Sequence, residues 1–575
     1  MQKSKVNAYY AISSLVFLLC AAMTVRQAAA EVEIWPAPAE AKVTMLQEEF
    51  RKDSHIWKSS DPTVRLAAAG GEHAFFQLVA AVKEDTLEDV TVSMLPLQGP
   101  GGPLPASAVR VYFCPLVKVY APSTENGKAG WYPDPLVKLT NPVVIRPNRY
   151  QERYNQTFWI EIEVPRGQRV GSYRGRVKLV AAGVEQAAFD VELRVWGFDL
   201  PKVPHYYAMF NTNRGWLSSY YDKERLAGKS LDQMLAIYFD FMLDRGIQPW
   251  FNPLIQPEQT PATGGGIEIN WPNKNWEERF LSHPAYKRVT FPAAPPGLGH
   301  GYEGEKFGTE FNKKVRDWVG GILEHYKKNG WQDKLTFFGP VDEPNSLEAY
   351  EELIRWGKLV KSVDPSISFQ VTEQPLPSNS DWPSLTQVAS DWVIHGKALE
   401  SNREEILRQL ALGNNASWYI SCDQTGTMAN YFIDEPGVDA RAVAWITYNY
   451  GLEGMLYWAT NFWREVKDPW SDVVTWKRSS CNAPLAGEGS LVYPGESIRR
   501  FCRQENVVGP VSSIRLELLR KGIEEIEYLH MLSAQGKSEE AMKLCMELVI
   551  SADTFTRDPG RFKKVKAKAA ALLVN

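Results

Sequence analysis

The predicted secondary structure changes near residue 200, and this change constrains the fold more than any other feature of the sequence. Before it, short apolar segments separated by Gly, Pro and Asn clusters predict strands with no helices between them. After it, strand-like segments alternate with amphipathic helical segments up to about residue 463. The junction at 198–204 contains Pro201 and Pro204, which end the last strand and stiffen the linker. The chain is therefore predicted to be multidomain.

Residues 31–200 are predicted to form an antiparallel β-sandwich. Their strand-like segments are short and regularly spaced, which is typical of two packed antiparallel sheets. The predicted strands are 74–82, 90–95, 109–113, 158–164, 174–181 and 188–196.

Residues 201–463 are predicted to form a (β/α)₈ TIM-type barrel. They contain seven or eight strand–helix units, and their total length is close to the roughly 250 residues typical of such barrels. The predicted strands are 206–210, 248–254, 335–338, 368–372, 391–395, 417–421 and 454–458, and the predicted helices are 231–245, 311–329, 346–363, 402–412 and 440–450. Residues 255–305 show no regular pattern, and a loop of that length inside a compact domain is usually functional. Residues 464–510 are expected to be an irregular connection packed on the barrel, and residues 511–575 C-terminal helices.

The N-terminus has the pattern of a secretory signal peptide, residues 1–30. Lys3 and Lys5 precede an apolar run at 11–23, and Ala28-Ala29-Ala30 is typical of a cleavage site. The residue before Cys20 is a leucine rather than a small residue, so a lipid anchor at Cys20 is not expected. The mature protein is therefore predicted to be secreted or periplasmic, with no integral membrane segment after cleavage.

Charge and ligand spacing exclude several classes of function. Removal of the signal peptide takes away three basic residues and no acids, so the formal charge changes from −4 to −7. A mildly acidic chain is not attracted to nucleic acid, and no nucleic-acid partner is expected. The eight histidines show no metal-binding spacing, so neither a metal site nor a cofactor is predicted. Five cysteines remain after cleavage, and a bridge between Cys481 and Cys502 is one pairing that the sequence allows.

Two adjacent acids follow one of the barrel strands, where such barrels carry their chemistry. The apolar strand 335–338 leads to Asp342 and Glu343, and Pro344 and Asn345 end the segment. Glycoside hydrolysis needs an acid for the leaving oxygen and a group that stabilises an oxocarbenium-like centre. A glutamate beside a second carboxylate suits the acid role, because the neighbouring charge favours its protonated form. The structural alternative, capping of the following helix, explains the pair less well.

A carboxylate nucleophile for this acid is not evident on the late strands. The strand 417–421 has no acid before Asp423, and 457–463 has none at all. Glu373, just after the strand 368–372, is the best spare carboxylate. Adjacent acids also allow a mechanism in which one of them polarises the substrate's own 2-acetamido group, which then attacks the anomeric carbon. The sequence favours this substrate assistance, with Glu373 as the alternative nucleophile.

Several motifs resemble those of glycoside hydrolase family 123. The strand end Gly339-Pro340-Val341-Asp342-Glu343-Pro344 is similar to the family's catalytic Asp-Glu pair. The similarity extends over nearly the whole mature chain, through 130–136, 171–175, 432–434 with Arg441, 456–458 with Asn461 and Trp463, 491–495 and 513–517. One departure is a second D-E-P motif, Asp434-Glu435-Pro436, which precedes a predicted helix where acids are ordinary.

The resemblance implies a secreted β-N-acetylgalactosaminidase with an N-terminal sandwich domain and acetamido participation. By this similarity Asp342 orients and polarises the acetamido group, and Glu343 is the general acid/base. The partner implied is a carbohydrate, a glycan or glycolipid that ends in N-acetylhexosamine.

Ten further residues at strand ends are candidates for substrate binding. Each also has an ordinary structural interpretation, as core packing, a polar turn or a satisfied histidine. They are Trp458, Trp463, Asn461, Tyr457, Tyr419, Asn211, Asn213, Arg214, His395 and Glu373. Trp131 and Tyr132 of the sandwich are expected to lie at the domain interface.

Two alternatives to this function remain open. One is a non-catalytic surface protein that binds glycans through the same pocket, although such a protein has no need for adjacent carboxylates at a strand end. The other is a barrel hydrolase of another sugar, with Glu343 as acid/base and a protein nucleophile.

Overall fold

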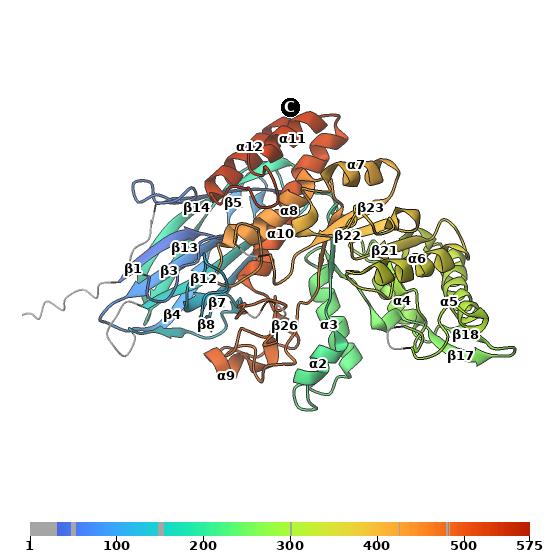
Figure 1. The fold of residues 1–575 in the computed structure, drawn as a ribbon. Helices are drawn as coiled ribbons and strands as arrows, with labels where there is room; N and C mark the ends of the chain where they lie inside the picture. Colours follow the sequence, from blue (N-terminus) through green and yellow to red (C-terminus); the bar gives the residue numbers. More distant parts are fainter. Residues whose placement is uncertain are drawn as a thin grey trace, which may run out of the picture.

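The computed structural model describes residues 32–47, 53–147, 154–299, 302–424, 426–478, 481 and 483–574. These residues form a group of antiparallel sheets, an eight-stranded parallel sheet and a set of C-terminal helices. In Figure 1 the antiparallel sheets lie on the left in blue, and the parallel sheet with its helices extends to the right in green and yellow. The signal peptide predicted for residues 1–30 lies outside the described residues.

Two packed sheets form the N-terminal domain, so the predicted sandwich is confirmed. Phe76, Phe158 and Ile160 of one sheet are fully buried with Val177 and Leu193 of the other, because alternate residues of each strand point inward. All pairings are antiparallel except that of β2 with β14. The five-stranded sheet has the order β1 (Glu33–Pro38), β3 (His73–Val82), β12 (Tyr154–Glu163), β7 (Val109–Cys114) and β10 (Val137–Lys138). The second sheet has the order β11 (Val143–Ile145), β4 (Leu87–Met94), β13 (Gly171–Ala181), β14 (Val184–Asp199) and β2 (Thr63–Gly70), with β5 (Gln98–Gly99) and β6 (Gly102–Pro103) at its side. A hairpin of β8 (Leu116–Val119) and β9 (Gly130–Pro133) extends the domain.

Eight parallel strands form the second domain, and the predicted (β/α)₈ architecture is confirmed. Their spatial order is β16 (Ile247–Pro249), β15 (Tyr207–Phe210), β24 (Gly454–Tyr457), β23 (Asn415–Tyr419), β22 (Asp391–His395), β21 (Ser368–Val371), β20 (Leu335–Phe338) and β19 (Val289–Pro292). Around the barrel the strands follow one another in chain order, and the last strand, β24, pairs with the first, β15. The pairings between these strands are parallel. The carboxyl ends of all eight strands therefore meet at one edge.

The two end strands of this sheet are joined through a side chain. Among the described residues no backbone ladder connects β16 with β19. The amide of Gln248, on β16, spans the gap: its Nε2 donates to Arg288 O at 2.8 Å, and its Oε1 accepts from Lys287 N at 2.7 Å. Gln248 is buried, so these bonds are shielded from water.

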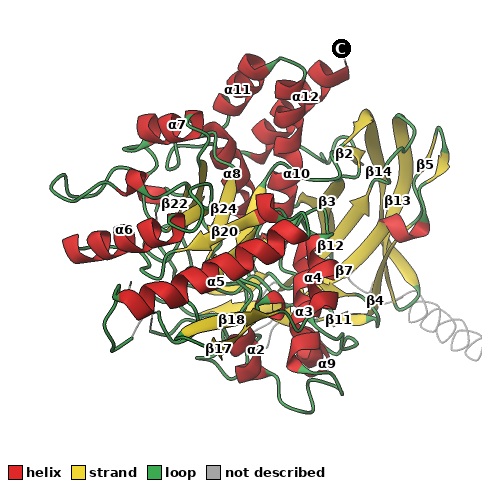
Figure 2. Cartoon of the chain, turned by 90° about the vertical axis from the view of Figure 1, so that its right-hand side faces the viewer, coloured by secondary structure: helices red, strands yellow, loops and turns green. Residues whose placement is uncertain are grey.

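Helices cover the outside of the parallel sheet, as Figure 2 shows for α5 and α6. They are α2 (Arg214–Tyr220), α3 (Leu231–Leu243), α4 (Lys274–Leu281), α5 (Thr309–Lys328), α6 (Leu347–Lys361), α7 (Arg403–Ala411) and α8 (Gly437–Asn449). The prediction that 255–305 is irregular is wrong in part. It contains α4, β19 and a hairpin of β17 (Glu258–Ala262) and β18 (Gly266–Asn270). The strand β19 has only four residues and lies among prolines and glycines, so it has no visible periodicity.

The C-terminal helices tie the two domains together. They are α9 (Ile498–Cys502), α10 (Ile514–Ala534), α11 (Ser538–Met546) and α12 (Pro559–Val574), with a small pair of β25 (Tyr493–Pro494) and β26 (Pro510–Val511) before α10. In Figure 1, α8 and α10 lie between the sandwich and the parallel sheet. Glu524 of α10 accepts from the backbone and Nδ1 of His73 in the sandwich. Glu517, on the same helix, accepts from Arg245 of the barrel.

Candidate active site

A cavity of about 940 Å³ opens at the carboxyl edge of the parallel sheet. Four of the predicted site residues line it: Glu343, Glu373, His395 and Tyr419. Glu343 and Glu373 follow β20 and β21, and His395 and Tyr419 are the last residues of β22 and β23. Four neighbouring strands therefore each contribute one polar side chain. The volume lies in the range of pockets that hold small ligands.

The acid pair lies in a tight loop between β20 and α6. Gly339 starts the loop, and a Cβ there would lie 2.3 Å from Leu353 Cδ1 of α6, so a larger residue would force this leucine side chain to move. Ser346 caps α6 by accepting from Ala349 N at 3.2 Å. The helix is thus capped by the serine, and both Asp342 and Glu343 remain exposed. This arrangement removes the capping interpretation of the two acids.

Thr372, just after β21, fixes the orientation of both acids. Its hydroxyl donates to Asp342 Oδ1 at 2.5 Å and accepts from the backbone N–H of Glu343 at 3.1 Å. Glu343 has a φ of 43°, a left-handed conformation that is uncommon for a glutamate. Such conformations persist where surrounding contacts determine them, and they cluster at functional sites.

Tyr419 holds the carboxylate of Glu343. Its hydroxyl donates to Glu343 Oε1 at 2.5 Å. Burial raises the pKa of Tyr419, and the bond to Glu343 and the nearby negative charges raise it further. The hydroxyl therefore stays protonated and available as a donor at neutral pH.

Glu373 is the second carboxylate of the cavity, and it is 8% exposed. Burial raises the pKa of Glu373 to about 7, and the charge of Glu343 adds to the effect. At mildly acidic pH this side chain is neutral. A neutral carboxylic acid is a poor nucleophile, so the environment of Glu373 does not favour the nucleophilic role considered for it.

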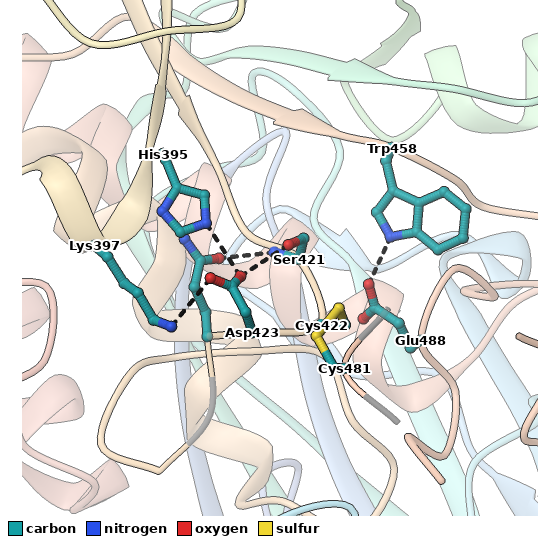
Figure 3. The surroundings of a disulfide bond; sticks show 9 residues. His395, Lys397, Ser421, Cys422, Asp423, Trp458, Cys481 and Glu488 are labelled. Atoms are coloured by element: carbon teal, nitrogen blue, oxygen red, sulfur yellow. Dashed lines mark hydrogen bonds and ion pairs between the residues drawn. A yellow bond between two sulfur atoms is a disulfide. The ribbon is translucent and has the colours of Figure 1, made fainter. Parts of the chain in front are cut away.

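His395 is held by an acid that the sequence reasoning did not single out. Its Nε2 lies 3.1 Å from Asp423 Oδ1, and Lys397 Nζ lies 3.0 Å from Asp423 Oδ2, as Figure 3 shows. The hydrogen bond from His395 is the main reason why the pKa of Asp423 is well below its usual range. The ring of His395 packs edge-on against Tyr419, with centroids 5.0 Å apart. His395 and Asp423 thus form one wall of the cavity.

A disulfide bond joins the cavity wall to the segment after the last strand. Cys422 pairs with Cys481, and both line the cavity. The pairing of Cys481 with Cys502 that the sequence allowed is wrong, and Cys502 is a free thiol. Sequence spacing alone could not select this pairing, because the two cysteines lie 59 residues apart.

The other predicted binding residues have structural contacts that occupy most of their polar groups. Asn213 caps α2, and Asn461 bonds the backbone N and O of Asn213 at 3.0 and 3.2 Å. Arg214 pairs with Asp232 on the surface at 2.5 Å. Asn211 bonds through its backbone to Tyr457 O and Thr460 N. Tyr457 and Trp463 are buried, and Trp458 is half-buried. Substrate contact by these residues stays a prediction.

The second D-E-P motif lies away from the cavity and connects the domains. Asp434 accepts from the backbone N and the hydroxyl of Ser123 at 2.8 and 2.6 Å, and Glu435 accepts from Thr124. Both acids therefore anchor a loop of the sandwich. Within the described part of the chain, no group of three His, Cys, Asp or Glu side chains is arranged to hold a metal ion, and no helix is long and apolar enough to cross a bilayer.

A parallel barrel with an exposed, oriented acid pair at its carboxyl edge defines the class of this protein as a glycoside hydrolase. Two family models support this. The glycoside hydrolase 123 catalytic domain matches residues 301–532, and the glycoside hydrolase 123 N-terminal domain matches residues 46–181. The chain belongs to glycoside hydrolase family 123, the β-N-acetylgalactosaminidase family.

One solved structure agrees with this chain in fold over nearly its whole length. A family 123 glycoside hydrolase from Clostridium perfringens, whose structural analysis concerned glycolipid glycan hydrolysis, superposes with a TM-score of 0.71 at 14% identity, covering 94% of this chain and 99% of that one. A family 39 glycoside hydrolase from Bacteroides cellulosilyticus has a TM-score of 0.33 at 12% identity, with 80% and 82% covered. A family 10 xylanase from Thermobacillus composti has a TM-score of 0.30 at 11% identity, with 55% and 97% covered. No curated protein sequence matches the chain.

Proposed function

We propose that this enzyme releases terminal β-linked N-acetylgalactosamine with retention of configuration, by participation of the substrate's 2-acetamido group. The substrates proposed are glycans or glycolipids, the latter suggested by the work on the Clostridium perfringens enzyme. The proposal includes secretion, on the strength of the signal-like N-terminus. Mass spectrometry of the exported protein should then find Glu31 as its first residue.

The observation that supports this mechanism most is that the two adjacent acids have different hydrogen-bond partners. Asp342 accepts a hydrogen bond from Thr372, and Glu343 accepts one from Tyr419. The two side chains are therefore held separately, although they are neighbours in sequence. One acid can contact the acetamido group while the other reaches the glycosidic oxygen.

The proposed reaction has two steps. Glu343 gives its proton to the glycosidic oxygen as the bond from that oxygen to C1 breaks, and the acetamido carbonyl oxygen forms a bond to C1. Asp342 accepts the acetamido N–H and stabilises the positive charge of the cyclic intermediate. In the second step water attacks C1, the carboxylate of Glu343 takes a proton from it, and the acetamido group is restored. Two inversions at C1 give net retention.

Hydrolysis of three 4-nitrophenyl glycosides tests this proposal. We expect cleavage of the β-N-acetylgalactosaminide, slower cleavage of its gluco epimer and no comparable cleavage of the β-galactoside, which has no acetamido group. Equal rates on the N-acetylgalactosaminide and the galactoside would contradict participation, and would favour a protein nucleophile such as Glu373.

A further inference from the structure

Glu488 is a buried carboxylate that the reaction above does not use. It lies in the irregular segment between β24 and β25, and only 2% of its surface is exposed. Trp458 Nε1 donates to Glu488 Oε1 at 2.5 Å, and the hydroxyl of Tyr457 donates to Glu488 Oε2 at 3.1 Å. One carboxylate therefore holds two consecutive aromatic side chains at the end of β24. Burying a carboxylate costs free energy, and these two hydrogen bonds offset that cost.

The register of the barrel strands places Trp458 at the mouth of the barrel. Tyr419 of β23 is paired with Leu456 of β24, and both belong to the cluster inside the barrel. β24 ends at Tyr457, so Trp458 is the first residue beyond the carboxyl end of the strand. Tyr419 is the residue that holds Glu343. Trp458 thus follows the strand that pairs with β23, the strand that carries the partner of the proposed acid.

Close packing fixes the ring of Trp458. Trp476 and Phe462 pack against it, with centroids 4.7 and 5.1 Å away. Gly489 has a φ of 68°, and a Cβ there would lie 2.5 Å from Trp458 Cζ2, so glycine is required beside the indole. The indole nevertheless remains half-buried rather than buried.

The segment that carries Glu488 is itself held on both sides. Arg515 donates to Gly487 O at 3.0 Å and to Ser490 O at 2.8 Å. The Cys422–Cys481 disulfide joins the same segment to the cavity wall, and Figure 3 shows it between Asp423 and the Trp458–Glu488 pair. Glu488 is therefore a fixed acceptor rather than a mobile side chain.

We propose that Glu488 is a positioning residue that holds the indole of Trp458 as one wall of the sugar subsite. This inference rests on the proposed function. A sugar ring can pack its C–H face on an indole, and the packing is favourable only when the indole is already fixed, because ordering a side chain on binding costs free energy. Loss of the carboxylate should therefore weaken substrate binding more than it slows the chemical step.

Steady-state kinetics with 4-nitrophenyl β-N-acetylgalactosaminide tests the inference. Glu488→Leu removes both acceptor oxygens at similar volume, and with them the hydrogen bond that orients the indole. It should raise KM about tenfold, the effect of about 1.4 kcal/mol, with a smaller change in kcat. Glu488→Gln should restore most of the loss, because its oxygen accepts from Trp458 while its amide donates to Tyr457. Trp458→Phe, which keeps an aromatic ring but lacks the donor, should match Glu488→Leu, and the double variant should lose no more than either.

Glu496→Leu is the matched control. Glu496 also accepts from a tyrosine hydroxyl, that of Tyr221 at 2.7 Å, so this variant should lower thermal stability and leave KM unchanged. With folding verified by circular dichroism, an unchanged KM in Glu488→Leu or in Trp458→Phe would overturn the positioning role of Glu488. That result would leave the proposed function of the enzyme standing. A wild-type enzyme that cleaves no N-acetylhexosaminide would instead overturn the proposed function.

Discussion

Thr372 explains how two neighbouring acids acquire different roles. It donates to Asp342 and accepts from the backbone of Glu343, whose left-handed conformation turns its side chain toward Tyr419. In an extended strand two consecutive side chains would point to opposite faces. Here the loop conformation brings both to the edge of the barrel, and the threonine keeps them there.

Substitution of each acid should give a different pattern of losses. Glu343→Gln should reduce kcat/KM by about 10²–10⁴-fold on substrates with poor leaving groups, and less on 4-nitrophenyl glycosides, which need little protonation. Asp342→Asn should lose activity on all substrates, because participation fails whatever the leaving group. Rates on a series of aryl and sugar leaving groups measure this. Wild-type activity in either variant would remove that residue from the mechanism.

Glu373 should make the stability of the protein depend on pH. Its pKa is raised from 4.5 to about 7 in the folded state, so its neutral form stabilises the fold at low pH. This contribution is complete below pH 4.5 and is lost as the pH rises through 7, by about 3 kcal/mol in total. Glu373→Gln removes the titration. Relative to wild type, this variant should therefore gain stability between pH 5 and pH 8.

Urea unfolding of both proteins at the two pH values measures this gain. Glu351→Gln, an exposed substitution on α6, serves as the control and should show no pH-dependent difference. A difference between wild type and Glu373→Gln that does not change with pH would contradict the raised pKa.

At the scale of elements, the strand ends of the site were predictable and the connecting segments were not. Hydrophobic runs and the acids after them located β20 to β24 and Asp342, Glu343, Glu373, His395 and Tyr419, because chemistry in this fold lies at strand ends. β19 was missed because it is short and is joined to β16 through the side chain of Gln248. Glu488 was missed because its segment has no periodicity. Its position depends on Arg515 and a disulfide, which are contacts distant in sequence.

The disulfide should stabilise the segment that carries Glu488. A Cys422→Ser/Cys481→Ser variant opens a loop whose ends lie 59 residues apart. Chain entropy predicts a loss of about 4 kcal/mol of unfolding free energy. Cys502→Ser, at a half-buried free thiol, is the control and should cost much less. Chemical denaturation measures both, and equal stability of the double variant and wild type would contradict a stabilising role for the bond.

At the scale of the whole molecule, the sandwich domain supports the active site. Asp134, in the loop after β9, binds Arg515 of α10 through two bonds of 2.9 and 3.0 Å, and Tyr493 donates to the same carboxylate. Arg515 in turn holds the backbone on both sides of Glu488. A series of buried contacts therefore connects the N-terminal domain with the mouth of the barrel.

Breaking this series of buried contacts should lower the free energy of unfolding. Asp134→Asn leaves the buried Arg515 without its counter-charge, and we expect a loss of about 3–5 kcal/mol in unfolding free energy. Glu192→Gln removes the partner of the exposed Arg174 and should cost no more than about 1 kcal/mol. Denaturant titrations compare the two variants. Losses of equal size would show that the Asp134–Arg515 pair is not a structural link between the domains.

The central claim is that the acetamido group of the substrate is the nucleophile. The most direct measurement is kcat/KM for 4-nitrophenyl β-galactosaminides that carry acetyl, fluoroacetyl, difluoroacetyl and trifluoroacetyl groups on nitrogen. Each fluorine makes the carbonyl oxygen less nucleophilic and changes its size little. We predict that kcat/KM falls with every fluorine added. A rate that does not change across the series would contradict participation of the acetamido group.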